Sequence, residues 1–289
     1  MTARTARCIC LSLYFFVVCA SLAGAQGTYT QIDFPAALMT QANGINGAGL
    51  IVGGYEDNAG GHGFLLQGGV YTKIDYPGAQ SSSAQGVNDK GQIVGVAEPV
   101  GYLFDMNNQS FTPIQYPGAL YTYPVAINNA GAIAGYFQRT NLIYQGFELV
   151  NLDFTEIIPP GSNDTFVNGI SAAGNLVGYA YINNNYSNFS FRQGKSRTIT
   201  IPSATEPFVL GTDPAGTALV GYYEPFSATG FVYRNRVFQA LSFPGSIVTV
   251  ATGVNAKGDV VGYFLDRSDV THGFLWTASA GVPEHTQSK

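Results

Sequence analysis

Two histidines are the residues of this sequence best suited to chemistry. His62 and His272 each open a His-Gly-Phe string, in units that would be neighbours if the chain closed into a ring. Imidazole nitrogens bind transition metals, so a two-histidine site with Asp57 or Asp269 as an oxygen ligand is one hypothesis. A repeated histidine that only hydrogen-bonds within its own unit is the simpler one, and no H-E-x-x-H or C-x-x-C pair occurs. We therefore expect no metal site and no cofactor.

Acidic residues recur near the ends of predicted strands, at Asp33, Asp75 and Asp153. A glycoside hydrolase needs two such carboxylates to converge in one cleft. In the architecture derived below they lie on outer strands of separate units, which favours structural roles. A G-x-S-x-G nucleophile elbow and a phosphate loop ending in G-K-[ST] do not occur. The sequence predicts no catalytic residue, although an enzyme stays an alternative.

Residues 1–25 have the order of a secretory signal peptide. Arg4 and Arg7 precede an apolar run over 9–20, and Ala23-Gly24-Ala25 forms a small-residue cleavage site before Gln26. No apolar run long enough to span a bilayer follows. We expect a secreted protein, extracellular or periplasmic, with no integral membrane segment in the mature chain.

Composition excludes several classes of protein. All three cysteines lie in the signal segment, so the mature chain can form no disulfide; lipid attachment at Cys19 is disfavoured by the bulky Val18 before it. Hydrophobic residues make up 46% and charged residues 11% of the chain, which argues against disorder. The net charge of −5 and the lack of a basic stripe argue against nucleic acid as a partner. The 36 glycines and 14 prolines, with many aromatics, favour short strands joined by tight turns.

The chain is a sixfold repeat with a period of about 42 residues. Each copy has a polar residue followed three positions later by Gly, which predicts a hairpin turn with positive φ at the Gly. A proline precedes each string by nine positions, and a further Gly follows the polar residue by seven or eight. The polar residues are Asn46, Asn88, Asn128, Ser171, Asp213 and Asn255, and the prolines are Pro35, Pro77, Pro117, Pro160, Pro202 and Pro244.

Each unit divides into four strands, and this number and period are typical of a β-propeller blade. We predict an all-β, six-bladed propeller of four-stranded antiparallel blades over residues 26–279, with 280–289 as a tail. The chain starts with an outer strand at 28–35 and ends with three strands, the last at 272–277. The first should complete the last blade and close the ring, which removes free sheet edges. A linear β-solenoid is the alternative.

The repeated strings carry a family resemblance. The IDFPG-like strand, the GIN-x-x-G-x-IVG centre and the HGF strand resemble the HAF-type extracellular repeat proteins of bacteria, over roughly residues 28–278. The His is kept in two units, and the fourth departs furthest, with Asn188-Phe189 in place of Gly-Phe. The resemblance implies a secreted bacterial repeat protein and transfers no catalytic residue.

The connection between the second and third strands varies most between units, so we expect any ligand on that face. Tyrosine and polar side chains there suit a glycan, a cell-wall polymer or a protein. We therefore expect a non-catalytic binding propeller; a polysaccharide hydrolase or lyase and a purely structural matrix protein are the alternatives. The candidate ligand-binding residues are Tyr55, Arg139, Tyr144, Tyr186, Glu224 and Asp266.

Overall fold

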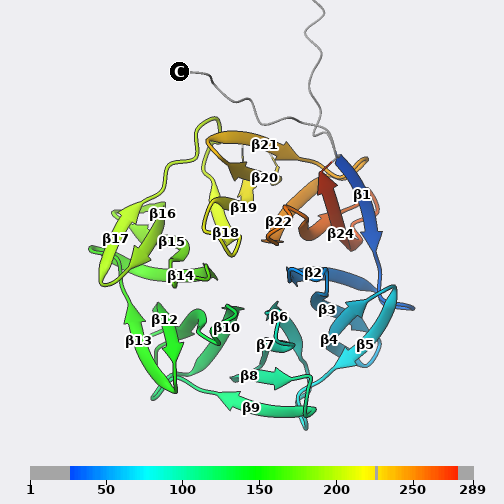
Figure 1. Ribbon diagram of the computed structural model, residues 1–289, viewed down its shortest axis with the longest axis horizontal. Coiled ribbons are helices and arrows are strands. Elements are labelled where there is room, and N and C mark those ends of the chain that lie inside the picture. Colours follow the sequence, from blue (N-terminus) through cyan, green and yellow to red (C-terminus); the bar gives the residue numbers. More distant parts are fainter. Residues whose placement is uncertain (1–26, 225–226, 279–289) are drawn as a thin grey trace, which may run out of the picture.

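The computed structural model describes residues 27–224 and 227–278, so the predicted signal peptide and the whole of the predicted tail lie outside it. Six four-stranded antiparallel sheets surround a central axis, and they form the predicted six-bladed β-propeller (Figure 1). The innermost strands β2, β6, β10, β14, β18 and β22 face the centre. Within residues 27–224 and 227–278 there is no helix of the length and hydrophobicity that a membrane span requires.

Blades 1 to 5 each take four consecutive strands, from the channel outward. Blade 1 consists of β2 (Met39–Ile45), β3 (Ile51–Asp57), β4 (Gly60–Gln67) and β5 (Val70–Ile74). Blade 2 consists of β6 (Ser83–Val87), β7 (Gln92–Ala97), β8 (Val100–Asp105) and β9 (Ser110–Ile114). Blade 3 consists of β10 (Tyr121–Ile127), β11 (Ile133–Gln138), β12 (Tyr144–Val150) and β13 (Asp153–Ile157). Blades 4 and 5 consist of β14 (Ser162–Ile170), β15 (Leu176–Ile182), β16 (Asn185–Arg192) and β17 (Lys195–Thr198); and β18 (Phe208–Thr212), β19 (Ala218–Tyr223), β20 (Thr229–Arg234) and β21 (Val237–Leu241).

Blade 6 combines both ends of the described chain. Its strands are β22 (Val248–Val254), β23 (Val260–Leu265), β24 (Thr271–Ala278) and, outermost, β1 (Gly27–Ile32). β1 lies antiparallel beside β24 in unbroken register from the Gly27–Ala278 pair to the Ile32–Gly273 pair (Figure 1). The predicted closure of the ring by the amino-terminal strand is confirmed.

The antiparallel order gives the propeller two different faces. The polar-turn face holds the turns between first and second strands of each blade and the hairpins between third and fourth strands. The variable-loop face holds the connections between second and third strands and the crossovers between blades. The six turn glycines 49, 91, 131, 174, 216 and 258 all have positive φ, from 73° to 89°, as predicted.

The hydrophobic core is divided into six clusters, one at each junction between neighbouring blades. The aromatic residue of the third strand is at most 2% exposed in every blade. Strand alternation places it in the cluster shared with the preceding blade, so packing between blades rather than within them stabilises the ring. These aromatics are Phe64, Tyr102, Phe147, Phe189, Phe231 and Phe274.

The repeated asparagines link the blades as well as forming the turns. Asn46 donates from Nδ2 to the carbonyl oxygen of Asn88 (3.1 Å), and Asn88 donates in the same way to Asn128 (3.0 Å). Asn128 donates to the carbonyl of Ser171 (3.1 Å), and Asn255 donates to that of Asn46 (3.2 Å). These buried hydrogen bonds from side-chain amides, which we call the amide ring, therefore join five of the six blades. A turn alone would not have required asparagine at these positions.

Aspartate replaces asparagine in blade 5 because that site supplies donors to the carboxylate. Asp213 accepts hydrogen bonds from the Thr217 hydroxyl (3.0 Å) and from Arg234 (3.4 Å). Its other oxygen accepts from the backbone of Thr217 and Ala218. At Asn128 the backbone also donates to one side-chain oxygen, but a second carboxylate oxygen there would face the carbonyl oxygen of Ser171 in place of a donor.

We therefore expect Asn128→Asp to lower the free energy of unfolding by about 2 kcal/mol, measured by urea denaturation at pH 7. The carboxylate can still accept from the backbone of Ala130 and Ala132, but it places an unprotonated oxygen against the Ser171 carbonyl. Asn235→Asp, at an exposed turn between β20 and β21, is the control and should change stability by less than about 0.5 kcal/mol. Equal losses in the two variants would contradict a role for the amide ring.

Candidate functional site

Partly exposed aromatic side chains line one side of blades 3, 4 and 5. In each of these blades the two inner strands hold one cross-strand pair of aromatic residues. The pairs are Tyr123 and Tyr136, Phe166 and Tyr179, and Phe208 and Tyr222. Residues at the start of the third strands add two more aromatics. We call this set the aromatic arc: Tyr123, Tyr136, Tyr144, Phe166, Tyr179, Tyr186, Phe208 and Tyr222.

The aromatic arc is continuous across its three blades. From Tyr123 through Tyr136, Phe166, Tyr179 and Phe208 to Tyr222, successive ring centroids are 4.9 to 5.1 Å apart. Tyr144 lies 5.2 Å from Phe166, and Tyr186 lies 5.2 Å from Phe208. Such a surface offers flat apolar faces to a ligand together with hydroxyl groups at the edges.

The aromatic arc occupies only part of the ring. The positions equivalent to Tyr123 and Tyr136 hold Gln41 and Gly54 in blade 1, and Ser83 and Val96 in blade 2. Blade 6 contributes Tyr263 alone. The sixfold backbone therefore carries an asymmetric surface, with aromatic groups on one side and small or polar groups on the other.

Four tyrosines on the inner strands of this surface have a raised hydroxyl pKa. Burial raises the pKa of Tyr136 and of Tyr222 to about 12, and burial together with neighbouring tyrosines raises the pKa of Tyr179 further. The Tyr123 hydroxyl donates to Glu98 (3.2 Å), whose charge adds to burial in raising the Tyr123 pKa. At neutral pH the hydroxyls of Tyr136, Tyr179 and Tyr222 are protonated and can donate hydrogen bonds to a ligand, whereas the Tyr123 proton is already donated to Glu98.

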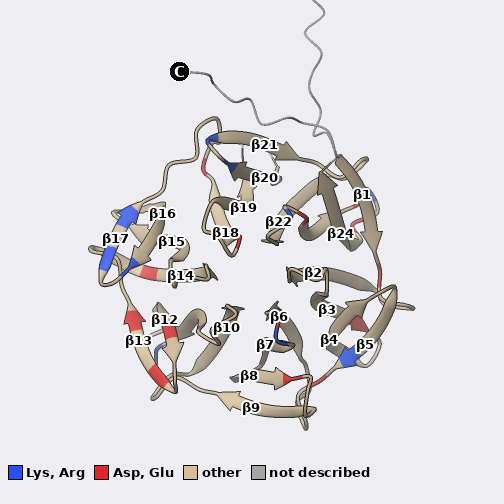
Figure 2. Ribbon diagram, in the orientation of Figure 1, with Lys and Arg blue, Asp and Glu red and all other residues tan. Residues whose placement is uncertain are grey.

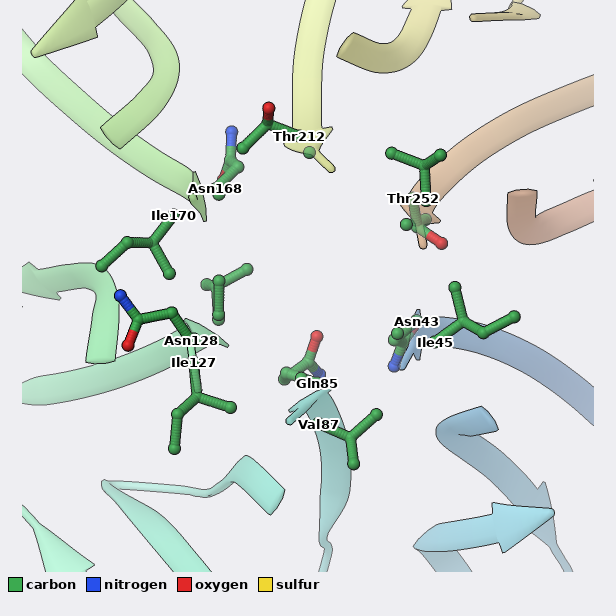
Figure 3. Close-up of a pocket in the computed structure, with 18 of the residues that line it drawn as sticks. Asn43, Ile45, Gln85, Val87, Ile127, Asn128, Asn168, Ile170, Thr212 and Thr252 are labelled. Atoms are coloured by element: carbon green, nitrogen blue, oxygen red, sulfur yellow. The ribbon is translucent and has the colours of Figure 1, made fainter. Parts of the chain in front are cut away.

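Two cavities adjoin the aromatic arc. The channel cavity, about 440 Å³, lies among the inner strands (Figure 3). Tyr136, Phe166, Tyr179 and Tyr263 contribute to its lining. The outer pocket, about 430 Å³, lies between β16 and the crossover from blade 4 to blade 5, and Tyr186 and Phe208 line it together with Asn184, Asn185 and Glu206. The arc thus connects a central cavity with a peripheral one.

A ring of equivalent inner-strand residues lines the channel cavity (Figure 3). Four members are polar and two are apolar, and all six are uncharged. Among the described residues that line this cavity, only Asp89 has an ionisable acidic or basic side chain. Figure 2 likewise shows most charged residues away from the central opening. The channel ring consists of Asn43, Gln85, Val125, Asn168, Leu210 and Thr252.

Two of the predicted binding residues, Tyr144 and Tyr186, belong to the aromatic arc, where they open equivalent strands β12 and β16. Tyr186 is 56% exposed. Glu224 is exposed just beyond β19, and its charge contributes to the raised pKa of Tyr222. Arg139 forms an ion pair with Glu156 and is not part of the arc.

Tyr55 is buried rather than exposed, and Asp266 is partly exposed but holds its own loop. Tyr55 is only 4% exposed, and its ring stacks on Phe34 with centroids 3.6 Å apart. Asp266 accepts hydrogen bonds from the backbone of Ser268 (2.7 Å) and Val270 (2.9 Å), which lower its pKa. The first side chain supports the core, and the second shapes its own loop.

The two histidines make equivalent contacts inside their own blades. His62 faces Asp75 from Nδ1 (2.9 Å) and Asp57 from Nε2 (3.3 Å). His272 faces Asp33 from Nδ1 (2.7 Å) and, more distantly, Asp266 from Nε2 (3.6 Å). The carboxylates beside His272 are therefore those of Asp33 and Asp266, and not that of Asp269. Within 27–224 and 227–278, no group of three His, Cys, Asp or Glu side chains is placed to hold a metal ion.

Asp153 is not equivalent to Asp33 and Asp75. Those two follow an outer strand and bind a histidine, whereas Asp153 begins β13. All three acids lie on or directly after outer strands of separate blades, as expected, but Asp153 lies at the opposite end of its strand from the other two.

Sequence reasoning missed most of the aromatic arc. Tyr136, Tyr179, Tyr222 and Tyr263 each directly follow the repeat glycine, a shared position that was visible in the sequence. Tyr55 follows that glycine by two positions, so it points to the opposite side of its sheet. An alignment of the units on the repeat glycine would have separated the aromatic residues that directly follow it from Tyr55, which follows it by two positions.

Neither a protein-family model nor a curated protein sequence matches the chain. Solved structures match its fold at low identity. TolB from Acinetobacter baumannii has a TM-score of 0.56 at 11% identity, covering 78% of this chain and 63% of that one, so this chain spans less than two thirds of TolB.

Two further matches cover nearly the whole of both chains. A lectin from Aleuria aurantia, in complex with Fucα1-6GlcNAc, has a TM-score of 0.53 at 10% identity, covering 89% of this chain and 93% of that one. A gluconolactonase from Xanthomonas campestris has a TM-score of 0.53 at 11% identity, covering 89% and 92%. At this identity, what the chain shares with these proteins is the β-propeller fold.

Proposed function

We propose that this protein is a secreted, non-catalytic binding propeller whose aromatic arc holds a glycan or cell-wall polymer. The observation that carries the proposal is the unbroken contact of partly exposed aromatic rings across three blades, beside two cavities. Carbohydrate rings present apolar C–H faces and hydroxyl edges, which complement aromatic faces and neutral tyrosine hydroxyls. A sugar-bound lectin among the proteins of similar fold supports the same class of ligand.

Secretion and kinship with HAF-type repeats belong to this proposal as well. Residues 1–25 support the first, and the repeated strings support the second. Export with a reporter fused after Gln26, compared with a fusion that lacks residues 2–25, tests the location. A protein ligand, polysaccharide hydrolysis or a purely structural role are the other outcomes of the binding tests.

Replacing Tyr144 and Tyr186 together by Ala should weaken binding of the polysaccharide that the parent protein binds at least tenfold, or about 1.4 kcal/mol. Each side chain reaches outward from the arc and packs on one Phe of the next blade. Because both are at least partly exposed, the melting temperature should shift by no more than a few degrees. Affinity electrophoresis in gels containing cellulose derivatives, chitosan, peptidoglycan fragments or mannan measures the binding.

Leu152→Ala is the matched control, since Leu152 is 86% exposed in the turn between β12 and β13 on the opposite face. It should leave retention unchanged. If the double variant binds as the parent does, the site is elsewhere. Release of reducing ends by the parent protein would establish a hydrolase, and retention by a protein but by no polysaccharide would replace the glycan as ligand.

A further inference from the structure

We propose that the ligand is a linear carbohydrate chain and that its terminal sugar enters the central channel, so that the protein recognises a chain end. This inference rests on the proposed function and deepens it. It requires a path from the aromatic arc into the channel, a lining that fits a sugar, and an elongated surface for the rest of the chain.

The path is supplied by shared lining residues. Phe166 and Tyr179 belong both to the arc and to the lining of the channel cavity. Tyr186 and Phe208 belong both to the arc and to the outer pocket. Since the ring of Tyr179 lies 5.1 Å from Phe208 and 5.8 Å from Tyr186, one row of aromatic groups runs from the channel to the periphery. A single sugar would contact a fraction of this surface, whereas a chain would follow it.

Hydrogen bonds from their nitrogens fix the side-chain amides of Asn43 and Asn168, and no donor to their oxygens lies within residues 27–224 and 227–278. Asn43 donates from Nδ2 to the carbonyl oxygen of Ala84 (2.9 Å), and Asn168 donates likewise to that of Val209 (3.1 Å). A carbonyl oxygen cannot donate, so the nitrogen of each amide must face it and the Oδ1 atom is turned to the other side. The side chain of Gln85 also reaches the opening (Figure 3). These groups can accept hydrogen bonds from sugar hydroxyls.

Both apolar members of the channel ring lie on the side of the aromatic arc. Val125 of blade 3 and Leu210 of blade 5 flank the polar Asn168 of blade 4 there. Thr252, Asn43 and Gln85 belong to blades 6, 1 and 2, on the side without it. A sugar ring has an apolar face and a rim of hydroxyls, and this lining offers a partner to each. Because the ring residues carry no charge, a neutral polyol fits better than an ion.

Two channel variants test the inference. Leu210→Phe narrows the lumen, and Gln85→Leu removes a polar group whose one side-chain bond is to Ser83 on its own strand. Leu152→Phe makes the first change on an exposed turn and is the matched control. Isothermal titration would measure binding of cellohexaose, chitohexaose, maltohexaose and xylohexaose, each also with a bulky group attached at its reducing or its non-reducing end. Urea unfolding verifies that each variant is folded.

We expect Leu210→Phe and Gln85→Leu each to weaken binding of the best hexasaccharide at least tenfold, and one end-blocked form to bind the parent at least tenfold less well than the free form. In Leu210→Phe the difference between free and blocked forms should disappear. If both channel variants bind as the parent does while the Tyr144 and Tyr186 variant loses binding, chain-end recognition is overturned and the proposed function stands. If no hexasaccharide binds, this inference fails. The proposed function is then decided separately, by whether the protein is retained in gels that contain a polysaccharide or by a protein ligand.

Discussion

A chain that lacks residues 26–35 is expected to aggregate or to unfold far below the melting temperature of the mature protein. These residues include β1, which pairs with β24 over six residue positions. Ile32 is 3% exposed and belongs to the core cluster between blades 6 and 1, and Phe34 stacks on Tyr55. The truncation therefore opens a sheet edge and uncovers one of the six junctions.

The size of this effect follows from the groups removed. Burial of a large apolar side chain contributes roughly 1.5 to 3 kcal/mol, and each ladder hydrogen bond contributes about 0.5 to 1.5 kcal/mol. Loss of a strand with two such side chains is thus comparable with the total stability of an ordinary domain, about 5 to 15 kcal/mol. Differential scanning calorimetry and size-exclusion chromatography measure the result.

Graded variants separate closure from a general effect of truncation. Ile32→Ala should cost about 2 to 5 kcal/mol, whereas Thr30→Ala, exposed on the same strand, should cost little. A peptide of residues 26–35 added to the truncated chain should restore part of its stability. A truncated chain as stable as the parent would show that the β1–β24 pairing does not hold the ring.

Gly178→Ala is the point substitution expected to destabilise most, by about 3 kcal/mol or more. Gly178 pairs with Val167 next to a register shift in β14, where the inner strand bulges toward it. An added Cβ would overlap the carbonyl oxygen of Phe166 and lie 3.1 Å from the Cα of Val167. Backbone on this packed inner strand has no room to move away, and all six blades have glycine at this position.

Gly131→Ala is a control that separates steric overlap from backbone conformation. Gly131 has a φ of 86°, and the nearest atom to an added Cβ is Gln92 Oε1 at 3.9 Å. The left-handed conformation alone should cost about 1 to 2 kcal/mol. Chemical denaturation of both variants measures the difference, and a loss in Gly178→Ala no greater than in Gly131→Ala would contradict the steric explanation.

The fold could be predicted because its signals recur in every unit. Six polar residues with glycine three positions later repeat the same turn, and the phase of the strands leaves β1 and β24 as partners. The second role of the asparagines was not predictable in this way, because Asn46 and Asn128 donate to blades 40 or more residues away. Turn chemistry is local, whereas that contact exists only after the ring has closed.

The candidate site could be predicted only in part. Tyr144 and Tyr186 were found because the connection between the second and third strands differs in sequence from blade to blade. The length of a connection does not, however, show which of its side chains are exposed. Tyr55 lies one position away from the alignment of Tyr136 and Tyr179, and a shift of one residue in a strand reverses the side on which a side chain lies. Arg139 had a partner, Glu156, that lies on a different strand and is not apparent in the connection itself.

The strand shared between the two ends of the chain also determines how the repeats depend on one another. In an open array each terminal repeat has a single neighbour, so terminal units fray first and specialised capping repeats are needed. Pairing of β1 with β24 joins segments about 240 residues apart, which in a flexible chain costs roughly 5 kcal/mol of loop-closure entropy. Once this cost is met, every blade has two neighbours and none is terminal. Denaturation should therefore proceed as one cooperative transition, with release of β1 as the event that opens the ring and leaves a blade without one of its neighbours.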